Sequence, residues 1–277
     1  MKYLLFLVVV FISISLNAQY FYKDIVGTQE TNNLITLYRS HKVQGVAITG
    51  YDADGTRSED FFGQQLFLSN KLKTITRSGV TDESQLTSDF DDKSRIVKTE
   101  DTTASMISTT IYAYDVAGRL VSTRSNSKDS GQSINETEEH KWFYNTTGKP
   151  ERMLKIINSS DTTEIKFIVD NAGNVAEEQT YKKGILGEKV YYYYDDKNRM
   201  TDIVRFNKRA GRLLPDYMFE YSPSNQVIQK ITVPANSSDY LIWRYQYNDK
   251  GLKVKEACYT REKQLTGKIE YVYSFGS

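Results

Sequence analysis

The stretch YDVAGRL, residues 114–120, has the composition of a tight turn between two β-strands. The side chain of Asp115 can accept a hydrogen bond from the backbone two residues on, and Gly118 tolerates the left-handed conformation that closes a hairpin. The residues before the turn alternate between two faces, as they do in a strand. We therefore expect a β-hairpin with its tip at residues 115–118.

The same turn recurs along the chain, and self-similarity at a near-constant period is typical of repeat architectures. Seven such stretches begin 24 to 30 residues apart: FDDKSRI from Phe90, YDVAGRL from Tyr114, YNTTGKP from Tyr144, VDNAGNV from Val169, YDDKNRM from Tyr194, YSPSNQV from Tyr221 and YNDKGLK from Tyr247. Each unit is predicted to be one hairpin. At Ser94, which takes the place of Gly or Asn, we expect a looser turn.

The strands that enter these turns carry an aromatic stripe on one face. Residues two apart share a face of a sheet, and the stripe positions are mostly Tyr, Trp and Phe. In EKVYYYYDDKNRM, residues 188–200, this pleat divides four consecutive tyrosines into two pairs. Tyr192 and Tyr194 join the stripe, whereas Tyr191 and Tyr193 are expected to point to the other face.

Together these motifs resemble the YD repeat of RHS-type proteins over roughly residues 90–273, and residues 114–120 match that motif in full. The resemblance implies stacked β-hairpins, a surface or secreted location and, in some relatives, carbohydrate binding. In large relatives, hundreds of residues of such repeats form a shell around a C-terminal toxin. This chain has too few repeats for that, so we do not expect a role in toxin delivery.

The predicted fold is all-β, with stacked antiparallel β-hairpin repeats over residues 90–277 that form a long twisted or curled sheet. Residues 19–89 are predicted to be an N-terminal cap, with a short helix from Thr28 and degenerate hairpins. A cap would protect the first exposed edge of the sheet. The alternative for this region is an independent domain of about seventy residues.

Residues 1–18, MKYLLFLVVVFISISLNA, form an export signal, with one lysine, an apolar run and a small-residue exit at Ala18. The apolar run of about fourteen residues is short for a membrane span, which needs about twenty. We expect an exported protein, with no transmembrane segment after signal removal. Its predicted location is the periplasm, outer surface or exterior of a Gram-negative bacterium, and its oligomeric state is left open.

Charge and cysteine content exclude several classes of protein. The chain has 36 Lys and Arg against 35 Asp and Glu, so it lacks the basic excess that binding to nucleic acids relies on. The short basic stretch NKRAGR, residues 207–212, is interpreted as a solvated loop. Cys258 is the single cysteine, so no intrachain disulfide can form.

The sequence contains no motif of a metal site or an enzyme. HExxH, paired CxxC, nucleophile-elbow, P-loop and dinucleotide patterns are missing, and the Asp-rich stretches 52–55 and 88–93 coincide with predicted turns. Four glutamates are candidate acids for glycoside hydrolysis, but nothing in the sequence places them across a cleft: Glu138, Glu139, Glu177 and Glu178. We expect no catalytic residue, no metal and no cofactor.

The leading functional prediction is a secreted, non-enzymatic β-repeat protein that binds a glycan or a cell-envelope protein. The candidate ligand-binding residues are aromatic, since an exposed ring can stack on a sugar: Trp142, Tyr191, Tyr193 and Trp243. Against this, cross-strand aromatic pairs stabilise a sheet by roughly 0.2–1 kcal/mol each, so packing alone explains a stripe. The alternative functions are an envelope hydrolase with loop-borne carboxylates and a purely structural component of a surface complex.

Overall fold

The computed structural model describes residues 20–79, 82–129, 131, 135–234, 237 and 239–276, so the predicted signal lies outside the described residues. Within them the chain forms one helix, α1 (Lys23–Ser40), and eighteen strands. The strands are β1 (Val43–Asp52), β2 (Arg57–Leu68), β3 (Lys71–Ser78), β4 (Asp82–Phe90), β5 (Ile96–Thr102), β6 (Met106–Tyr114), β7 (Leu120–Asp129), β8 (Asn135–Tyr144), β9 (Pro150–Ile157), β10 (Asp161–Val169), β11 (Val175–Lys182), β12 (Ile185–Tyr194), β13 (Met200–Asn207), β14 (Arg212–Tyr221), β15 (Val227–Thr232), β16 (Leu241–Tyr247), β17 (Lys253–Tyr259) and β18 (Leu265–Phe275).

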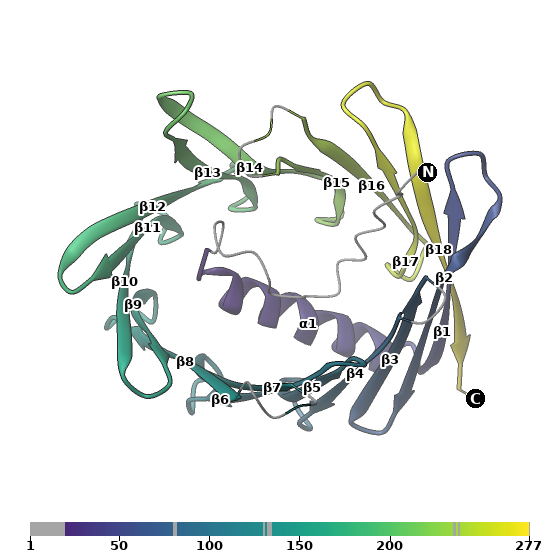
Figure 1. Ribbon diagram of the computed structural model, residues 1–277, viewed down its shortest axis with the longest axis horizontal. Helices are drawn as coiled ribbons and strands as arrows, with labels where there is room; N and C mark the ends of the chain where they lie inside the picture. Colours follow the sequence, from purple (N-terminus) through teal and green to yellow (C-terminus); the bar gives the residue numbers. More distant parts are fainter. Residues whose placement is uncertain are drawn as a thin grey trace.

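The sheet closes into a barrel. Each strand pairs antiparallel with the next, and β18 pairs with β1, where Tyr271 lies opposite Ile48 (Figure 1). The predicted long twisted or curled sheet with a cap at one end is therefore wrong. Closure leaves no free edge to protect, and β1–β4, from the region predicted to be the cap, belong to the same wall. Closure depends on strand tilt and stagger, which alternating residues do not encode.

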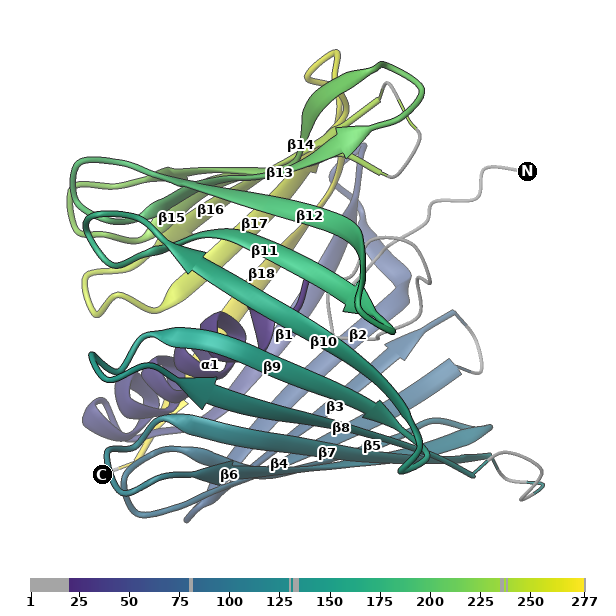
Figure 2. The same ribbon diagram turned by 90° about the vertical axis from the view of Figure 1, so that its left-hand side faces the viewer.

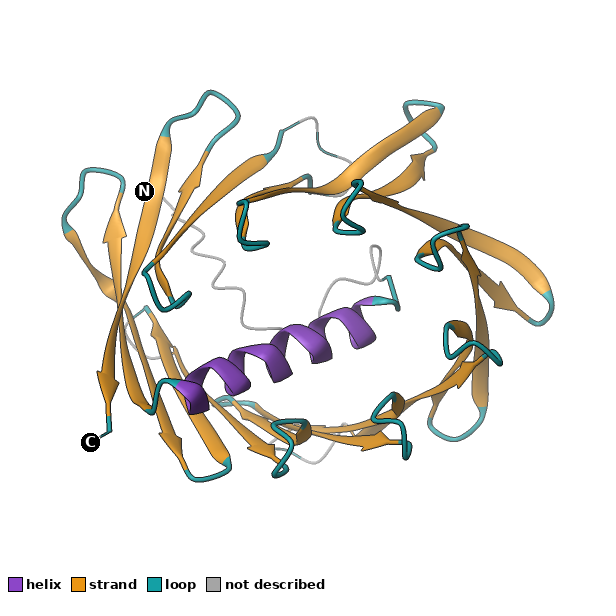
Figure 3. Ribbon diagram, turned by 180° about the vertical axis from the view of Figure 1, so that it is seen from behind, coloured by secondary structure: helices purple, strands orange, loops and turns teal. Residues whose placement is uncertain are grey.

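The helix lies inside the barrel and crosses its lumen (Figures 1 and 3). It begins at Lys23, earlier than the predicted start at Thr28. Ile35 and Tyr38 of the helix are buried against the barrel wall, and Tyr38 donates a hydrogen bond of 2.9 Å to Gln65 on β2. The helix is therefore part of the hydrophobic core, and these contacts with the wall stabilise it although few of its residues are apolar.

The aromatic stripe faces the lumen and contributes Trp142, Phe167 and Tyr192 to this core, with further stripe tyrosines packed against it. One cluster lies around the start of α1 and contains Phe21, Leu120, Trp142, Met153, Ile165, Phe167, Val175, Val190, Tyr192 and Ile203. A second cluster lies around the end of α1 and contains Ile35, Tyr38, Val43, Val46, Phe67, Leu72, Phe90, Ile96 and Leu252. Much of the inner face of the wall is thus used for packing.

All seven predicted turns are confirmed, and they lie at one end of the barrel (Figures 2 and 3). In each turn the first residue exchanges backbone hydrogen bonds with the third and fourth residues after it. The closing residue has a positive φ in every case: Ser94, Gly118, Gly148, Gly173, Asn198, Asn225 and Gly251. The expectation of a looser turn at Ser94 is wrong, because its φ of 63° gives the same backbone path.

The side chains of the repeat signature join consecutive hairpins. Arg199 Nε donates to Asp195 Oδ2 at 2.7 Å, and the Arg199 guanidinium lies 4.7 Å from the ring centroid of Tyr221 in the next unit. The Tyr221 hydroxyl donates at 2.7 Å to the carbonyl oxygen of Met200. The same arrangement links Arg95 to Tyr114 and Arg119 to Tyr144. Tyr, Asp and Arg recur because together they connect neighbouring hairpins.

Candidate functional site

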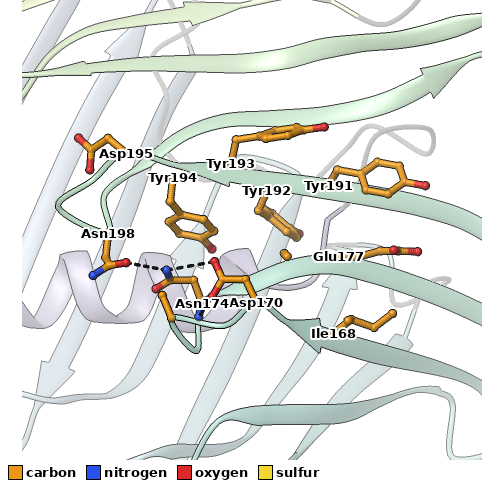
Figure 4. A pocket seen from close by; sticks show the side chains of 12 residues that line it. Ile168, Asp170, Asn174, Glu177, Tyr191, Tyr192, Tyr193, Tyr194, Asp195 and Asn198 are labelled. Atoms are coloured by element: carbon orange, nitrogen blue, oxygen red, sulfur yellow. Dashed lines mark hydrogen bonds between the residues drawn. The ribbon is translucent and has the colours of Figure 1, made fainter.

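The four-tyrosine run on β12 places two rings on the outer face of the barrel (Figure 4). Tyr193 is 48% exposed, whereas Tyr192 is 3% exposed and faces the core. Tyr191 shares the face of Tyr193, and it lies opposite Glu177 on β11 and Val204 on β13. The predicted division of the tyrosines by the pleat is confirmed.

A shallow depression of about 540 Å³ lies at this point of the wall, between β10, β11 and β12. Its outward-facing part is formed by the two tyrosine rings, by Ile168, which is 45% exposed, and by Glu177. The turns after β10 and β12 complete it with Asp170, Ala172, Asn174, Asp195 and Asn198. We call this site the tyrosine depression.

Polar groups of fixed orientation border the tyrosine depression. Glu177 accepts hydrogen bonds from Lys189 at 2.7 Å and from Gln179 at 2.8 Å. Partial burial would raise the pKa of Glu177, but these two hydrogen bonds outweigh it and lower that pKa below its ordinary value. Asn174 donates to Asn198 at 2.9 Å, which joins the two turns (Figure 4). The site therefore offers two aromatic rings beside an ionised carboxylate and two amides.

The two predicted tryptophans lie elsewhere. Trp142 on β8 is 3% exposed and stacks on Phe167 at 5.0 Å between ring centroids, inside the barrel. Trp243 on β16 is half-buried, opposite Lys230 and Cys258. Of the four predicted ligand-binding residues, the structure thus brings only the half-buried Tyr191 and the exposed Tyr193 together on the outer face.

Sequence reasoning missed a group of buried ionisable residues that anchors α1. Glu178 on β11 is 1% exposed and accepts hydrogen bonds from the backbone N–H groups of Phe21 and Tyr22 and from the Tyr192 hydroxyl. Burial raises the pKa of Glu178 even though these hydrogen bonds oppose it. The available signal was the pair of consecutive glutamates: in a strand, Glu177 and Glu178 must face opposite sides.

A second anchor involves His140, which is 5% exposed. Its ring contacts Asp24 of α1 at 2.5 Å and Glu138 at 2.9 Å, and Glu138 also pairs with Lys155 at 2.7 Å. Burial alone would lower the pKa of His140, but the facing carboxylates raise it to about 9. For Glu138 the hydrogen bonds from His140 and Lys155 overcome burial and lower the pKa to about 2. His140 is thus a charged link between wall and helix.

Two further observations concern the described part of the chain. No helix in it is long and apolar enough to cross a membrane. Among the same residues, no group of three or more His, Cys, Asp or Glu side chains is arranged to hold a metal ion.

Comparisons with known proteins give structural neighbours only. No family model and no curated protein matches the chain. A porin-like protein from Bacteroides uniformis aligns with 84% of this chain and 97% of its own, at 12% identity and a TM-score of 0.39. A chain of the Photorhabdus luminescens Tc holotoxin pore aligns with 78% of this chain at 14% identity and a TM-score of 0.35. This chain spans 12% of that toxin chain. These structural similarities are too low to support an argument about function.

Proposed function

We propose that this is an exported, non-enzymatic YD-repeat protein that binds a glycan at the tyrosine depression. The observation that carries the proposal is the position of the exposed Tyr193 and the half-buried Tyr191 beside Glu177 on the outer wall, whereas stripe residues such as Trp142 and Tyr192 are buried inside the barrel. Packing of the lumen does not explain two rings on the outer wall. A binding role does.

The geometry of the tyrosine depression suits a sugar chain. Tyr191 and Tyr193 are two residues apart on one strand, so their Cα atoms are separated by about 6.6 Å, and both rings project from the same face. An aromatic ring presents an apolar surface to the C–H groups of a sugar. The Glu177 carboxylate and the Asn174 and Asn198 amides supply acceptors and donors for its hydroxyl groups.

The outer wall around the site is suited to water. It carries ion pairs on many strands, including Lys141–Glu139, Arg152–Glu164, Lys189–Glu177 and Lys268–Glu270. In a lipid-facing wall, a basic side chain near the bilayer midplane costs about 2–4 kcal/mol. We therefore propose that the wall faces an aqueous compartment, in keeping with the export signal.

The hydrolase alternative loses support because the candidate glutamates have other partners. Glu138 pairs with His140 and Lys155, and Glu178 holds the start of α1. The outward-facing Glu139 and Glu177 pair with Lys141 and Lys189. Glycoside hydrolysis needs two carboxyl groups that face each other across the substrate, and these four are held in separate contacts.

The test is a glycan array probed with the mature chain from Gln19, followed by titration of each hit. We expect Tyr193→Ala and Tyr191→Ala to weaken binding at least tenfold. The matched control is Phe62→Ala, which removes another outer-wall ring, one beneath Arg77 at 5.8 Å. It should bind like the wild type.

Two outcomes would overturn the proposal: no glycan binds the wild type, or the tyrosine variants bind as tightly as Phe62→Ala. An envelope pull-down with the same variants distinguishes the alternatives. Capture of a protein by the wild type but not by Tyr193→Ala, with a blank array, would replace the glycan by a protein partner. A blank in both experiments would favour the purely structural role.

A further inference from the structure

Several hairpins project at the end of the barrel opposite the seven turns, and two of them are neighbours through the pairing of β12 with β13 (Figures 1 and 2). One joins β11 to β12 through Lys183 and Gly184, and the other joins β13 to β14 through residues 208–211. Side chains are exposed throughout residues 182–188 and 208–213. We call these segments the two distal hairpins.

The distal hairpins expose large apolar side chains. Phe206 and Leu213 lie directly opposite each other on β13 and β14, and are 56% and 43% exposed. Ile185 and Leu186, at the start of β12, are 74% and 45% exposed. Scattered apolar residues are normal on a protein surface, whereas apolar groups gathered at a protruding site mark an interaction surface.

Cations without partners accompany these apolar groups. Lys208, Arg209 and Arg212 lie in the hairpin of Phe206, and Lys183 lies in the hairpin of Ile185. Among the described residues, none of the four cations has a carboxylate within ion-pair distance. The neighbouring carboxylates are already engaged: Asp161 with Lys182, and Glu188 and Asp216 with Arg205. The basic stretch at residues 207–212, which the sequence analysis interpreted as a solvated loop, thus lies beside exposed apolar side chains.

We propose that the distal hairpins dock the protein onto an anionic lipid surface. Apolar side chains that enter the headgroup region, flanked by Lys and Arg that meet lipid phosphates, are the pattern of peripheral membrane binding. The chain is nearly neutral overall, with 36 basic and 35 acidic residues, so the attraction comes from this local arrangement. A soluble glycan would have no use for four exposed aliphatic and aromatic tips.

The two proposed sites fit one orientation. The tyrosine depression lies on the side wall and reaches the turns at the opposite end. A protein held to a leaflet by its distal hairpins would keep this depression in water. The docking proposal does not rest on glycan binding, and Tyr193→Ala should leave docking unchanged.

Flotation of the mature chain with vesicles tests the proposal. We expect binding to phosphatidylcholine vesicles that contain phosphatidylglycerol, weak binding to phosphatidylcholine alone, and a marked loss at high salt. The triple variant Lys208→Glu/Arg209→Glu/Arg212→Glu and the double variant Phe206→Ser/Leu213→Ser should each bind at least tenfold more weakly. The matched control, Lys93→Glu/Lys197→Glu/Lys250→Glu, makes the same charge change in turns at the other end and should bind like the wild type.

A reporter variant guards against misfolding of the charge variants. In Phe206→Trp, the new tryptophan should shift its emission to the blue when anionic vesicles are added, because its ring enters a less polar environment. Equal binding to both kinds of vesicle, no binding at all, or equal losses in the hairpin and control triples would overturn the proposal. So would dimerisation through the distal hairpins with no emission shift on vesicles.

Discussion

The carboxylate of Glu178 on β11 accepts hydrogen bonds of 3.0 and 2.9 Å from the backbone N–H group of Phe21, just before the start of α1. The helix has no side-chain cap of its own at Tyr22. A negative group from the wall therefore satisfies N–H groups that a helix start leaves unpaired, and it opposes the positive end of the helix dipole. These hydrogen bonds hold the start of the helix to the barrel wall.

Replacement of this carboxylate should loosen the start of the helix. In Glu178→Gln, one oxygen becomes an NH₂ group that faces other N–H donors, so we expect the free energy of unfolding to fall by about 2 kcal/mol. Backbone amides at residues 21–28 should exchange faster with deuterium. Glu177→Gln is the matched control, because it removes only a surface pair with Lys189, worth less than about 1 kcal/mol. Equal losses in the two variants would contradict the anchoring role.

Stability should depend on pH through His140. Its pKa is raised to about 9, so its contribution is complete below its ordinary pKa near 6.5 and is lost as the pH rises through 9. On the order of 3 kcal/mol is at stake. Denaturant titrations from pH 6 to 9.5 should show this decline in the wild type and a flatter profile in His140→Gln. Parallel profiles would show that the Asp24–His140 contact does not stabilise the protein.

The acid side of the profile reports on Glu138. Its pKa is lowered to about 2, so its contribution is present above the ordinary value of 4.5 and is lost as the pH falls toward 2. Glu138→Gln should have a lower free energy of unfolding than the wild type at neutral pH. Between pH 4.5 and 2.5 it should lose less stability than the wild type does. An unchanged acid profile in this variant would show that the contacts with His140 and Lys155 do not carry the effect.

The tyrosine of the repeat signature should contribute through its hydroxyl. Tyr221→Phe removes the 2.7 Å hydrogen bond to the carbonyl of Met200, and we expect a loss of about 0.5–1.5 kcal/mol in chemical denaturation. Tyr193→Phe is the control, because this exposed tyrosine lies on the outer wall. If both variants are as stable as the wild type, the hydroxyl does not join consecutive hairpins.

The buried Trp142 should contribute strongly to the stability of the fold. Trp142→Ala leaves a cavity beside Phe167, and we expect a loss of about 3–5 kcal/mol in the free energy of unfolding. Tyr193→Ala should cost far less, because its ring is half exposed. Thermal unfolding of both variants measures the contrast, and a Trp142→Ala protein as stable as Tyr193→Ala would contradict the buried position.

Local features of the fold could be predicted from the sequence, and long-range ones could not. The turns follow from residues within one short segment, such as Asp115 and Gly118. The outward direction of Tyr193 follows from the period of a strand. Closure depends on the pairing of β1 with β18, which are far apart in the chain, and no sequence pattern in either strand indicates that they pair.

The same distinction applies to the site and to the helix anchors. Tyr191 and Tyr193 could be selected from sequence because the pleat separates them from the stripe. The assumption that Trp142 could be exposed failed because a stripe on a closed barrel faces the lumen. The partners of α1, Glu178 and His140, are distant in sequence, so only the structure brings them to Phe21 and Asp24.

Closure of the sheet decides which side chains face the lumen and which face the outside of the barrel. Ala47 on β1 and Val272 on β18 are register partners with exposed side chains, and paired strands hold such Cα atoms about 4.5–5.5 Å apart, within disulfide range. Under mild oxidation, Ala47→Cys/Val272→Cys should form an intramolecular disulfide that speeds migration on a non-reducing gel. Ala47→Cys/Lys141→Cys, on distant strands, should not. Free thiols or only intermolecular disulfides in the first variant would contradict the closed barrel.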